Sequence, residues 1–277
     1  MYKGIDVSQW QDEVDWKKVK ASGIEFAVIR AGYGRLAAQE DKRFAENIFS
    51  ADEAGIPAGV YWYSYAVTAA EAEKEAEACL RVIKPHAELI TLPIFFDQEY
   101  EPDIVRLTNE KRTDICLAFL KRIAAAGYRA GLYCSFDWWQ NKLDEERLRG
   151  WPLWIAQYGK ACEADSGDIV AWQYSCTGRV GGISGNVDLD RGYDGLFPSN
   201  GWLQVGGDWY YIQDGRFLHD RWIRSGGWWY RLGSDAKMVT GWVETDGKLY
   251  WCNENRAHGI PKGACIITDD DGAVQGV

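Results

Sequence analysis

A unit of helix, glycine and apolar strand recurs along the N-terminal part of the chain. Gly23, Gly55 and Gly127 each end a helical segment, and each precedes a short run of apolar residues. Strands that alternate with helices predict a parallel sheet. About eight strand-like runs follow one another, and that number predicts a closed β/α barrel of the TIM type.

The later units of this pattern leave little room for helices, so the α/β barrel is predicted to be irregular. One helix is expected over 138–148, and Thr68 with Glu71 forms a capping box at the start of another. The expected strands are 2–7, 25–30, 58–65, 92–100, 129–134, 153–158, 169–174 and 186–189.

Polar and aromatic residues gather where these strands end, which is where barrels of this type carry their active sites. Aromatic faces pack against sugar rings, and carboxylates supply acid, base and hydrogen bonds, so the set predicts a carbohydrate site. Any single tyrosine of the set is better explained by core or rim packing, whereas chance convergence of the whole set is a much weaker explanation. The residues are Asp6, Tyr33, Tyr63, Tyr65, Asp97, Glu99, Tyr133, Tyr158, Tyr174 and Asp188.

Two carboxylates follow the buried run Leu92–Phe96 with one residue between them. Successive strand residues alternate in side, so Asp97 and Glu99 should point the same way. Two charges so close cannot both form cheaply, and one pKa should rise. This arrangement suits a proton donor beside a group that stays charged. The alternative is that the two residues merely begin a polar loop.

Charge and residue types exclude several other classes of function. A formal net charge of −10 argues against nucleic acid as a partner, and no apolar run is long enough to insert into a membrane. The chain lacks a CxxC pair, and His86, His219 and His258 lie in no recognisable motif. No metal or cofactor is therefore expected, and carboxylates are the expected acid and base.

The cysteines and the N-terminus bear on where the chain is made. Seven cysteines are scattered without a disulfide framework, which predicts reduced thiols, although a bridge between Cys162 and Cys176 is left open. Residues 2–7 are strand-like and do not resemble a signal peptide. We therefore expect a protein made in the cytoplasm without a signal peptide.

Residues 202–277 differ in composition from the rest, because seven of the 15 tryptophans lie there. Trp202, Trp222 and Trp242 recur every twenty residues, as do Gly207, Gly227 and Gly247. Such a period predicts stacked β-hairpins in a small solenoid. The expected division is therefore a barrel over 1–195, a linker over 196–201 and a repeat domain over 202–277.

Aromatic side chains between such repeats can form cages for quaternary ammonium groups. They can equally form the thin core of the hairpins. The candidate ligand-binding residues of the tail are Trp202, Trp209, Tyr210, Trp222, Trp229, Tyr230, Trp242 and Tyr250.

Taken together, residues 1–195 resemble glycoside hydrolase family 25, the lysozymes of the Chalaropsis type. The tail resembles cell-wall-binding repeats of the choline-binding type, and the combination is similar to phage endolysins and to autolysins of Gram-positive bacteria. The motifs that carry the first resemblance are Gly4–Ser8 with Trp10, Arg30–Gly34, Asp97–Glu99, Trp172–Tyr174 and Gly185–Leu189.

The resemblance implies a muramidase that cuts the β-1,4 bond from N-acetylmuramic acid to N-acetylglucosamine in peptidoglycan. Glu99 would be the general acid, and Asp97 would hold the acetamido group as it attacks the anomeric carbon with retention. Direct attack by a carboxylate is the alternative. Asp6 and Asp188 would orient and tune this pair, with Asp188 favoured over Asp190. The expected substrate contacts are Tyr33, Tyr63, Tyr133, Trp172 and Tyr174.

Departures from the tail pattern keep other interpretations open. Leu249 stands where Trp209 and Trp229 stand in the other repeats, and Arg231 stands at an aromatic position. Few cages can form, so the ligand is either choline or another wall polymer such as a teichoic acid. The competing functions are a non-catalytic wall-binding protein and a chitinase-like glycosidase. As a hydrolase, the protein would act at the bacterial cell wall after release, whether of phage or of host origin.

Overall fold

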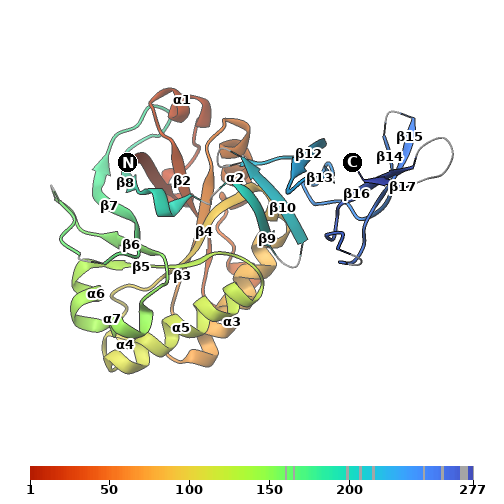
Figure 1. Ribbon diagram of the computed structural model, residues 1–277. Coiled ribbons are helices and arrows are strands. Elements are labelled where there is room, and N and C mark those ends of the chain that lie inside the picture. Colours follow the sequence, from red (N-terminus) through yellow and green to blue (C-terminus); the bar gives the residue numbers. More distant parts are fainter. Residues whose placement is uncertain are drawn as a thin grey trace. The chain divides into compact units, whose positions relative to one another are not determined.

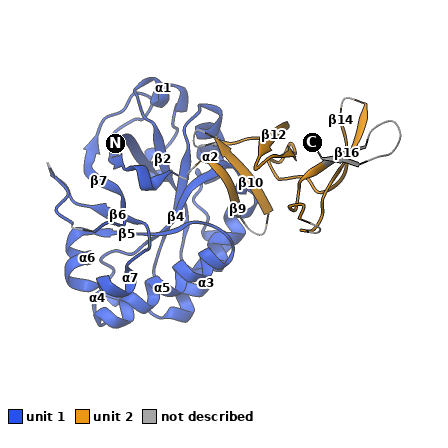
Figure 2. Ribbon diagram, in the orientation of Figure 1, with its two compact units in different colours: residues 1–198 blue, residues 199–277 orange. Residues whose placement is uncertain are grey.

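The computed structural model describes residues 1–159, 161–164, 166–197, 200–205, 208–213, 216–245, 247–256, 259–268 and 274–276. The chain divides into two compact units, residues 1–198 and 199–277 (Figure 2). This division falls inside the expected linker 196–201. Within that linker Pro198 and Ser199 lie outside the described residues, as does Gly207 of the repeat.

Unit 1 contains a closed barrel of eight strands in chain order (Figure 1). Neighbouring strands from β1 to β7 run parallel, so the predicted irregular α/β barrel is confirmed in architecture. The strands are β1 (Tyr2–Val7), β2 (Phe26–Tyr33), β3 (Ala58–Tyr63), β4 (Ile90–Asp97), β5 (Ala130–Ser135), β6 (Leu153–Ala156), β7 (Ile169–Gly178) and β8 (Val187–Gly192).

The last strand corrects the prediction of an all-parallel sheet. β8 runs antiparallel to both β7 and β1, because the chain turns straight back after β7 without an intervening helix. It also extends to Gly192, beyond the expected 186–189. Its register places Asp188 opposite Asp6 and Asp190 opposite Gly4. The pairing of β8 with β1 closes the barrel, and it therefore places the carboxylates of Asp188 and Asp190 beside β1.

Helices pack outside the strands, and α3 and α5 pack against each other (Figure 1). The Thr68 side chain accepts a hydrogen bond from the Glu71 amide at the start of α3, as expected for a cap. The helix expected over 138–148 is split in two at Leu143 and Asp144. None of the described helices combines the length and apolar character needed to cross a bilayer. The α-helices are α1 (Trp16–Ala21), α2 (Phe44–Glu53), α3 (Ala69–Ile83), α4 (Pro102–Val105), α5 (Asn109–Ala125), α6 (Phe136–Lys142) and α7 (Glu145–Leu148), and the 3₁₀ turns are Gln9–Gln11, Ala37–Gln39, Lys84–Leu89 and Asp194–Leu196.

Aromatic rings fill the interior of the barrel below the strand ends. A Cβ atom at Gly4 would lie 2.1 Å from the Phe26 ring, and one at Gly131 would lie 2.7 Å from the Phe95 ring, so both glycines make room for these rings. Phe26 and Phe95 belong to one buried apolar cluster. Alternation along β2 and β4 then turns Arg30 and Asp97 to the same interior. Polar groups are thus concentrated toward the carboxyl ends of the strands.

The described residues of unit 2 form small hairpins in three separate sheets. Trp202, Trp222 and Trp242 occupy the same place in three hairpins, as the twenty-residue period predicts. They pair across the strands with Tyr211, Arg231 and Trp251 respectively. The strands are β9 (Gly201–Val205), β10 (Asp208–Gln213) and β11 (Arg216–Phe217) in the first sheet, β12 (Arg221–Ser225) and β13 (Trp228–Leu232) in the second, and β14 (Gly241–Thr245), β15 (Lys248–Cys252), β16 (Cys265–Thr268) and β17 (Val274–Gly276) in the third.

The prediction of reduced thiols is wrong for one pair of cysteines. Cys252 and Cys265 form a disulfide, and they pair directly between β15 and β16. This contact joins two strands whose pairing cannot be read from local sequence. Cys162 and Cys176 carry free thiols, so the bridge left open between them is absent.

Candidate active site

A cavity of about 230 Å³ lies at the carboxyl ends of the barrel strands, and we call it the acidic cavity. All four carboxylates expected from the strand ends line it. Its lining residues are Asp6, Arg30, Tyr61, Tyr63, Asp97, Glu99, Tyr133, Trp154, Tyr158, Gln173, Cys176 and Asp188.

Asp97 and Glu99, the carboxyl pair, point into this cavity from the end of β4. Gln98 between them points the other way, where its Oε1 accepts hydrogen bonds from Trp138 Nε1 at 3.2 Å and from Cys116 Sγ at 3.3 Å. Asp97 is buried and Glu99 is half-buried. Strand alternation therefore places both carboxylates on one side, as the sequence predicts.

The carboxyl pair holds a proton more tightly than isolated acids do. Burial raises the pKa of Asp97 well above its usual value, and the charge of Glu99 raises it further. Burial also raises the pKa of Glu99; hydrogen bonding to Asp97 opposes that rise, and the charges of Glu101 and Asp188 add to it. Two buried charges side by side are costly, so each carboxyl of the pair is harder to ionise than an isolated one.

A second group of acids lies across the cavity on β1 and β8. Burial raises the pKa of Asp6, and the charges of Asp190 and Asp188 raise it further. Burial raises the pKa of Asp190 to about 7, and Trp154 Nε1 donates to its Oδ1 at 2.8 Å. Asp188 lines the cavity, whereas Asp190, two residues along the same face, is almost fully buried. Both aspartates between which the sequence left a choice therefore face inward.

Gln173 organises this side of the cavity, although the sequence singled it out only as part of a motif. Its Nε2 donates to Asp6 Oδ2 at 2.8 Å, and its Oε1 accepts from the Tyr133 and Tyr158 hydroxyls at 3.0 and 3.1 Å. The available signal was one amide inside an otherwise apolar strand. Arg30, Tyr61 and Trp154 were also missed as lining residues, because they lie within strands and not at their ends.

The predicted aromatic contacts divide into two groups. Tyr63 and Tyr133 line the acidic cavity, and the Tyr63 hydroxyl donates to Glu101 Oε1 at 2.6 Å. Trp172 and Tyr174 do not line it, because they alternate with the inward-facing Gln173. Trp172 Nε1 instead donates to the Gln157 carbonyl oxygen at 2.7 Å, and Arg191 lies over the Tyr174 ring.

A second cavity of about 370 Å³ shares Arg30 and Tyr63 with the first, and we call it the aromatic cavity. Gln9, Trp10, Tyr33 and Tyr65 complete its lining. Trp10 is 74% exposed and Tyr65 is 49% exposed. Exposed aromatic faces beside a set of carboxylates are suited to sugar rings.

The tail aromatics fall into exposed and buried sets. Trp202 packs against Tyr230 with ring centroids 4.7 Å apart, and Trp222 packs against Tyr250 at 4.8 Å. Trp242 is 61% exposed, whereas Tyr210 and Tyr230 are buried. Trp202, Trp209, Trp222, Trp229 and Tyr250 are half-buried. Tyr210 stacks on Phe217 and thus contributes mainly to packing.

Comparison with known proteins identifies relatives of the barrel. The profile of the glycosyl hydrolases family 25 matches residues 5–183. Lysozyme M1 of Streptomyces globisporus is 31% identical over 198 residues, which are 68% of this chain and 67% of that protein.

Two solved structures are similar to the same part of the chain. The modular autolysin LytC of Streptococcus pneumoniae aligns with a TM-score of 0.62 at 29% identity, over 69% of this chain and 46% of LytC. A bacterial lysozyme of Streptomyces coelicolor aligns with a TM-score of 0.59 at 28% identity, over 69% of this chain and 91% of that protein. The chain belongs to the glycosyl hydrolases family 25, and its barrel is a glycoside hydrolase of the lysozyme type.

Proposed function

We propose that the barrel cuts the β-1,4 bond between N-acetylmuramic acid and N-acetylglucosamine in peptidoglycan. The observation that carries this proposal is the carboxyl pair, whose pKa values are both raised, in a cavity that shares Arg30 and Tyr63 with the aromatic cavity. The structure of LytC has also been solved in complex with a synthetic peptidoglycan ligand. The sugar rings would lie on Trp10, Tyr33 and Tyr65.

In the proposed reaction Glu99 gives its proton to the leaving glycosidic oxygen as the bond from that oxygen to the anomeric carbon breaks. The acetamido oxygen of the same sugar attacks this carbon, while Asp97 accepts the acetamido N–H. Asp97 Oδ1 is buried without a hydrogen-bond partner among the described residues, so it is available for that bond. Water then opens the ring intermediate and returns a proton to Glu99, which gives retention. Asp6 and Asp188 would orient and tune the pair.

The test replaces Glu99 with glutamine and measures new reducing ends released from purified peptidoglycan. Loss of activity by at least a thousandfold is expected, because no other group at this place would supply the proton. Glu110→Gln, an exposed change at the start of α5, is the matched control. Full activity of Glu99→Gln in a folded protein would contradict the assignment.

Fragment analysis separates the proposed reaction from its alternatives. Mass spectrometry should find muramic acid at the new reducing end and little release from chitin. A covalent glycosyl-enzyme in a quenched reaction would instead favour direct attack by a carboxylate. Fragments from chitin alone would favour the chitinase-like function, and no fragments from wild-type protein would favour a wall-binding role.

For the tail we infer a ligand on a polymer of the cell wall, outside the cell. This polymer would carry a small organic cation, such as choline. Support comes from Trp202, whose ring meets those of Tyr211 and Tyr230 at steep angles, as the walls of a cage do. Arg231 occupies the place of Tyr211 in the next hairpin and disfavours a second cation there. Quenching of tryptophan fluorescence by choline, lost in Trp202→Ala, tests this inference.

A further inference from the structure

Arg30 is the one cation among the described residues that line the acidic cavity, and it lines the aromatic cavity as well. Its side chain is 11% exposed. A guanidinium carries several N–H donors, and a nearly buried donor that lacks an acceptor is costly. The hydrogen-bond partners of this side chain therefore indicate what it is available to bind.

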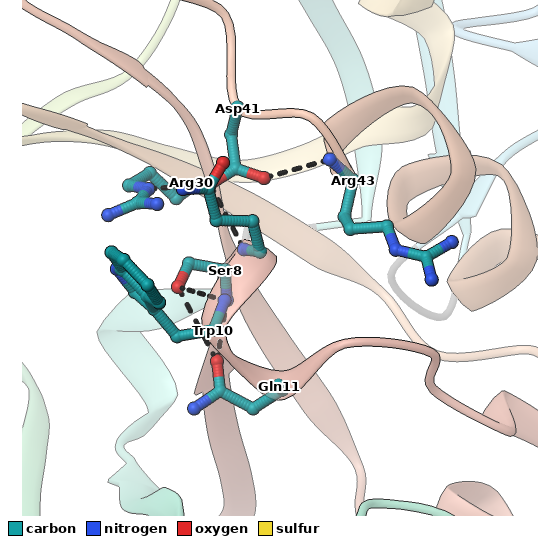
Figure 3. A network of polar contacts seen from close by, with 7 residues as sticks. Ser8, Trp10, Gln11, Arg30, Asp41 and Arg43 are labelled. Carbon is teal, nitrogen blue, oxygen red and sulfur yellow. Dashed lines mark hydrogen bonds and ion pairs between the residues drawn. The ribbon is translucent and has the colours of Figure 1, made fainter.

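Asp41 accepts one of these donors (Figure 3). The Asp41 side chain is fully buried, and its Oδ2 accepts from Arg30 Nε at 2.6 Å. Within the described ranges no hydrogen bond is made by the two terminal nitrogens of Arg30. Because Asp41 binds Nε, these two nitrogens are left for a ligand in the cavities that Arg30 lines.

The same carboxylate also fixes the turn that carries Trp10 (Figure 3). Oδ2 of Asp41 accepts from the Gln9 amide at 3.0 Å, and Oδ1 accepts from the Arg43 amide at 2.9 Å. Both Gln9 and Trp10 line the aromatic cavity. One buried aspartate therefore holds the donors of Arg30 and an aromatic wall for sugar rings in a fixed relation.

Barrel register places Arg30 and Asp97 on the two strands that flank β3. Arg30 of β2 pairs with Tyr61, and Tyr63, two residues along the same face of β3, pairs with Asp97 of β4. All four residues line the acidic cavity. Strands two apart are separated by roughly 10 Å, which one sugar ring with its substituents spans. A ring that is held at Asp97 can therefore present a second substituent to Arg30.

Muramic acid carries such a substituent. It differs from N-acetylglucosamine by a lactyl ether at C3, which is the carbon next to the one that bears the acetamido group. The lactyl group ends in a carbonyl, which is an amide where a stem peptide is attached and a carboxylate where the peptide is absent. The terminal N–H groups of arginine donate to both. Since four carboxylates line the cavity, a further anion can be bound there only beside a cation.

We propose that the terminal nitrogens of Arg30, held in place by Asp41, bind the lactyl carbonyl of muramic acid and thereby select this sugar over N-acetylglucosamine at the position that is cut. The inference rests on the proposed function, in which Asp97 holds the acetamido group of the same sugar. Arg30 is thus a specificity-determining residue, and Asp41 is a positioning residue that acts through Arg30.

Three forms of one peptide-free glycan test this proposal. Amidase treatment of peptidoglycan leaves the lactyl carboxylate, coupling to methylamine turns it into an amide, and reduction of its ester turns it into an alcohol without a carbonyl. For wild-type protein, kcat/KM for the alcohol should be about tenfold below that for either carbonyl form. The faster of the two carbonyl forms shows whether peptide-free or peptide-carrying strands present the better acceptor.

Arg30→Met removes every donor, so kcat/KM for both carbonyl forms should fall to the value for the alcohol. Arg30→Lys keeps a cation but loses the paired donors, so the preference for the carbonyl forms should shrink to a few-fold. The same few-fold preference in Arg30→Lys carries the test if Arg30→Met cuts no form.

Asp41→Asn tests the positioning role, because Arg30 is retained while its anionic acceptor is lost. The preference for the carbonyl forms over the alcohol should again shrink to a few-fold. Arg35→Gln is the matched control, because Arg35 pairs with Glu71 at the surface, and its preference should equal that of wild type.

Each preference is a ratio measured on one preparation of protein, so partial unfolding of a variant does not alter it. Equal cleavage of all three forms by wild type, or an undiminished preference in Arg30→Met or Arg30→Lys, would overturn the inference and leave the proposed function standing. Cleavage of intact peptidoglycan but of no peptide-free form would place recognition in the stem peptide and would also overturn it. Absence of new reducing ends from intact peptidoglycan would instead remove the proposed function itself.

Discussion

Glu75 on α3 should make the barrel less stable as pH rises. Its side chain is fully buried, and its Oε1 accepts from the Tyr65 amide at 2.9 Å, whereas its Oε2 has no partner among the described residues. Burial raises the pKa of Glu75 from 4.5 to about 7. The folded state therefore binds this proton more tightly than the unfolded state does.

The size and sign of the effect follow from that difference. Between pH 4.5 and about 7 the folded protein holds more protons, so the free energy of unfolding falls as pH rises and levels off above pH 7. The step is at most about 3.5 kcal/mol, since a rise of about 2.5 pKa units corresponds to about 1.4 kcal/mol per unit. Glu75→Gln keeps the acceptor for Tyr65 and removes the charge, so the variant should gain up to about 3 kcal/mol over wild type between pH 4.5 and pH 8.

Calorimetric unfolding of both proteins at pH 4.5 and pH 8 measures this gain. For a barrel of this size the midpoint advantage of Glu75→Gln should grow by roughly 6–10 °C between the two pH values. Glu73→Gln, an exposed change on the same helix, should show no such growth. The glutamine amide affects packing equally at both pH values. A difference in midpoint between Glu75→Gln and wild type that is the same at pH 4.5 and pH 8 would therefore refute the argument.

Three further changes test other parts of the structure. Gln173→Leu removes the donor to Asp6 and should lower kcat by about tenfold or more at unchanged fold, as reducing-end release and circular dichroism would register. Trp10→Ala removes an exposed face of the aromatic cavity and should raise KM several-fold with kcat nearly constant; a fall in kcat alone would contradict a binding role. Replacement of Cys252 and Cys265 by serine should lower tail stability by about 3 kcal/mol and leave the barrel transition in calorimetry unchanged, and an equal shift of both transitions would argue against it.

Local patterns were sufficient for much of the barrel and for the carboxyl pair. Gly23, Gly55 and Gly127 marked the repeated unit, and alternation at the end of β4 put Asp97 and Glu99 on one side. These features depend on neighbours in the chain, which is why the sequence predicts them.

Other features depend on how distant segments meet. The direction of β8 was predicted wrongly, because an apolar run specifies a strand but not its orientation. Gln173 and Arg30 face the cavity through barrel register, and Cys252 meets Cys265 through pairing of β15 with β16. Apart from the single amide of Gln173 in an otherwise apolar strand, these contacts leave no local signature in the chain.

Because β8 runs antiparallel to β7, the two strands form a hairpin whose two parts have different roles. Residues 189–192 pair with β1 and β7 and close the cylinder, whereas residues 179–186 form the turn at the active-site end of β7. Insertions or deletions in that turn could remodel the rim beside Asp188 while the pairing of β8 with β1 and β7 stays intact. The hairpin is therefore the natural place for evolution, or for an engineer, to vary which glycan strands are admitted without rebuilding the scaffold.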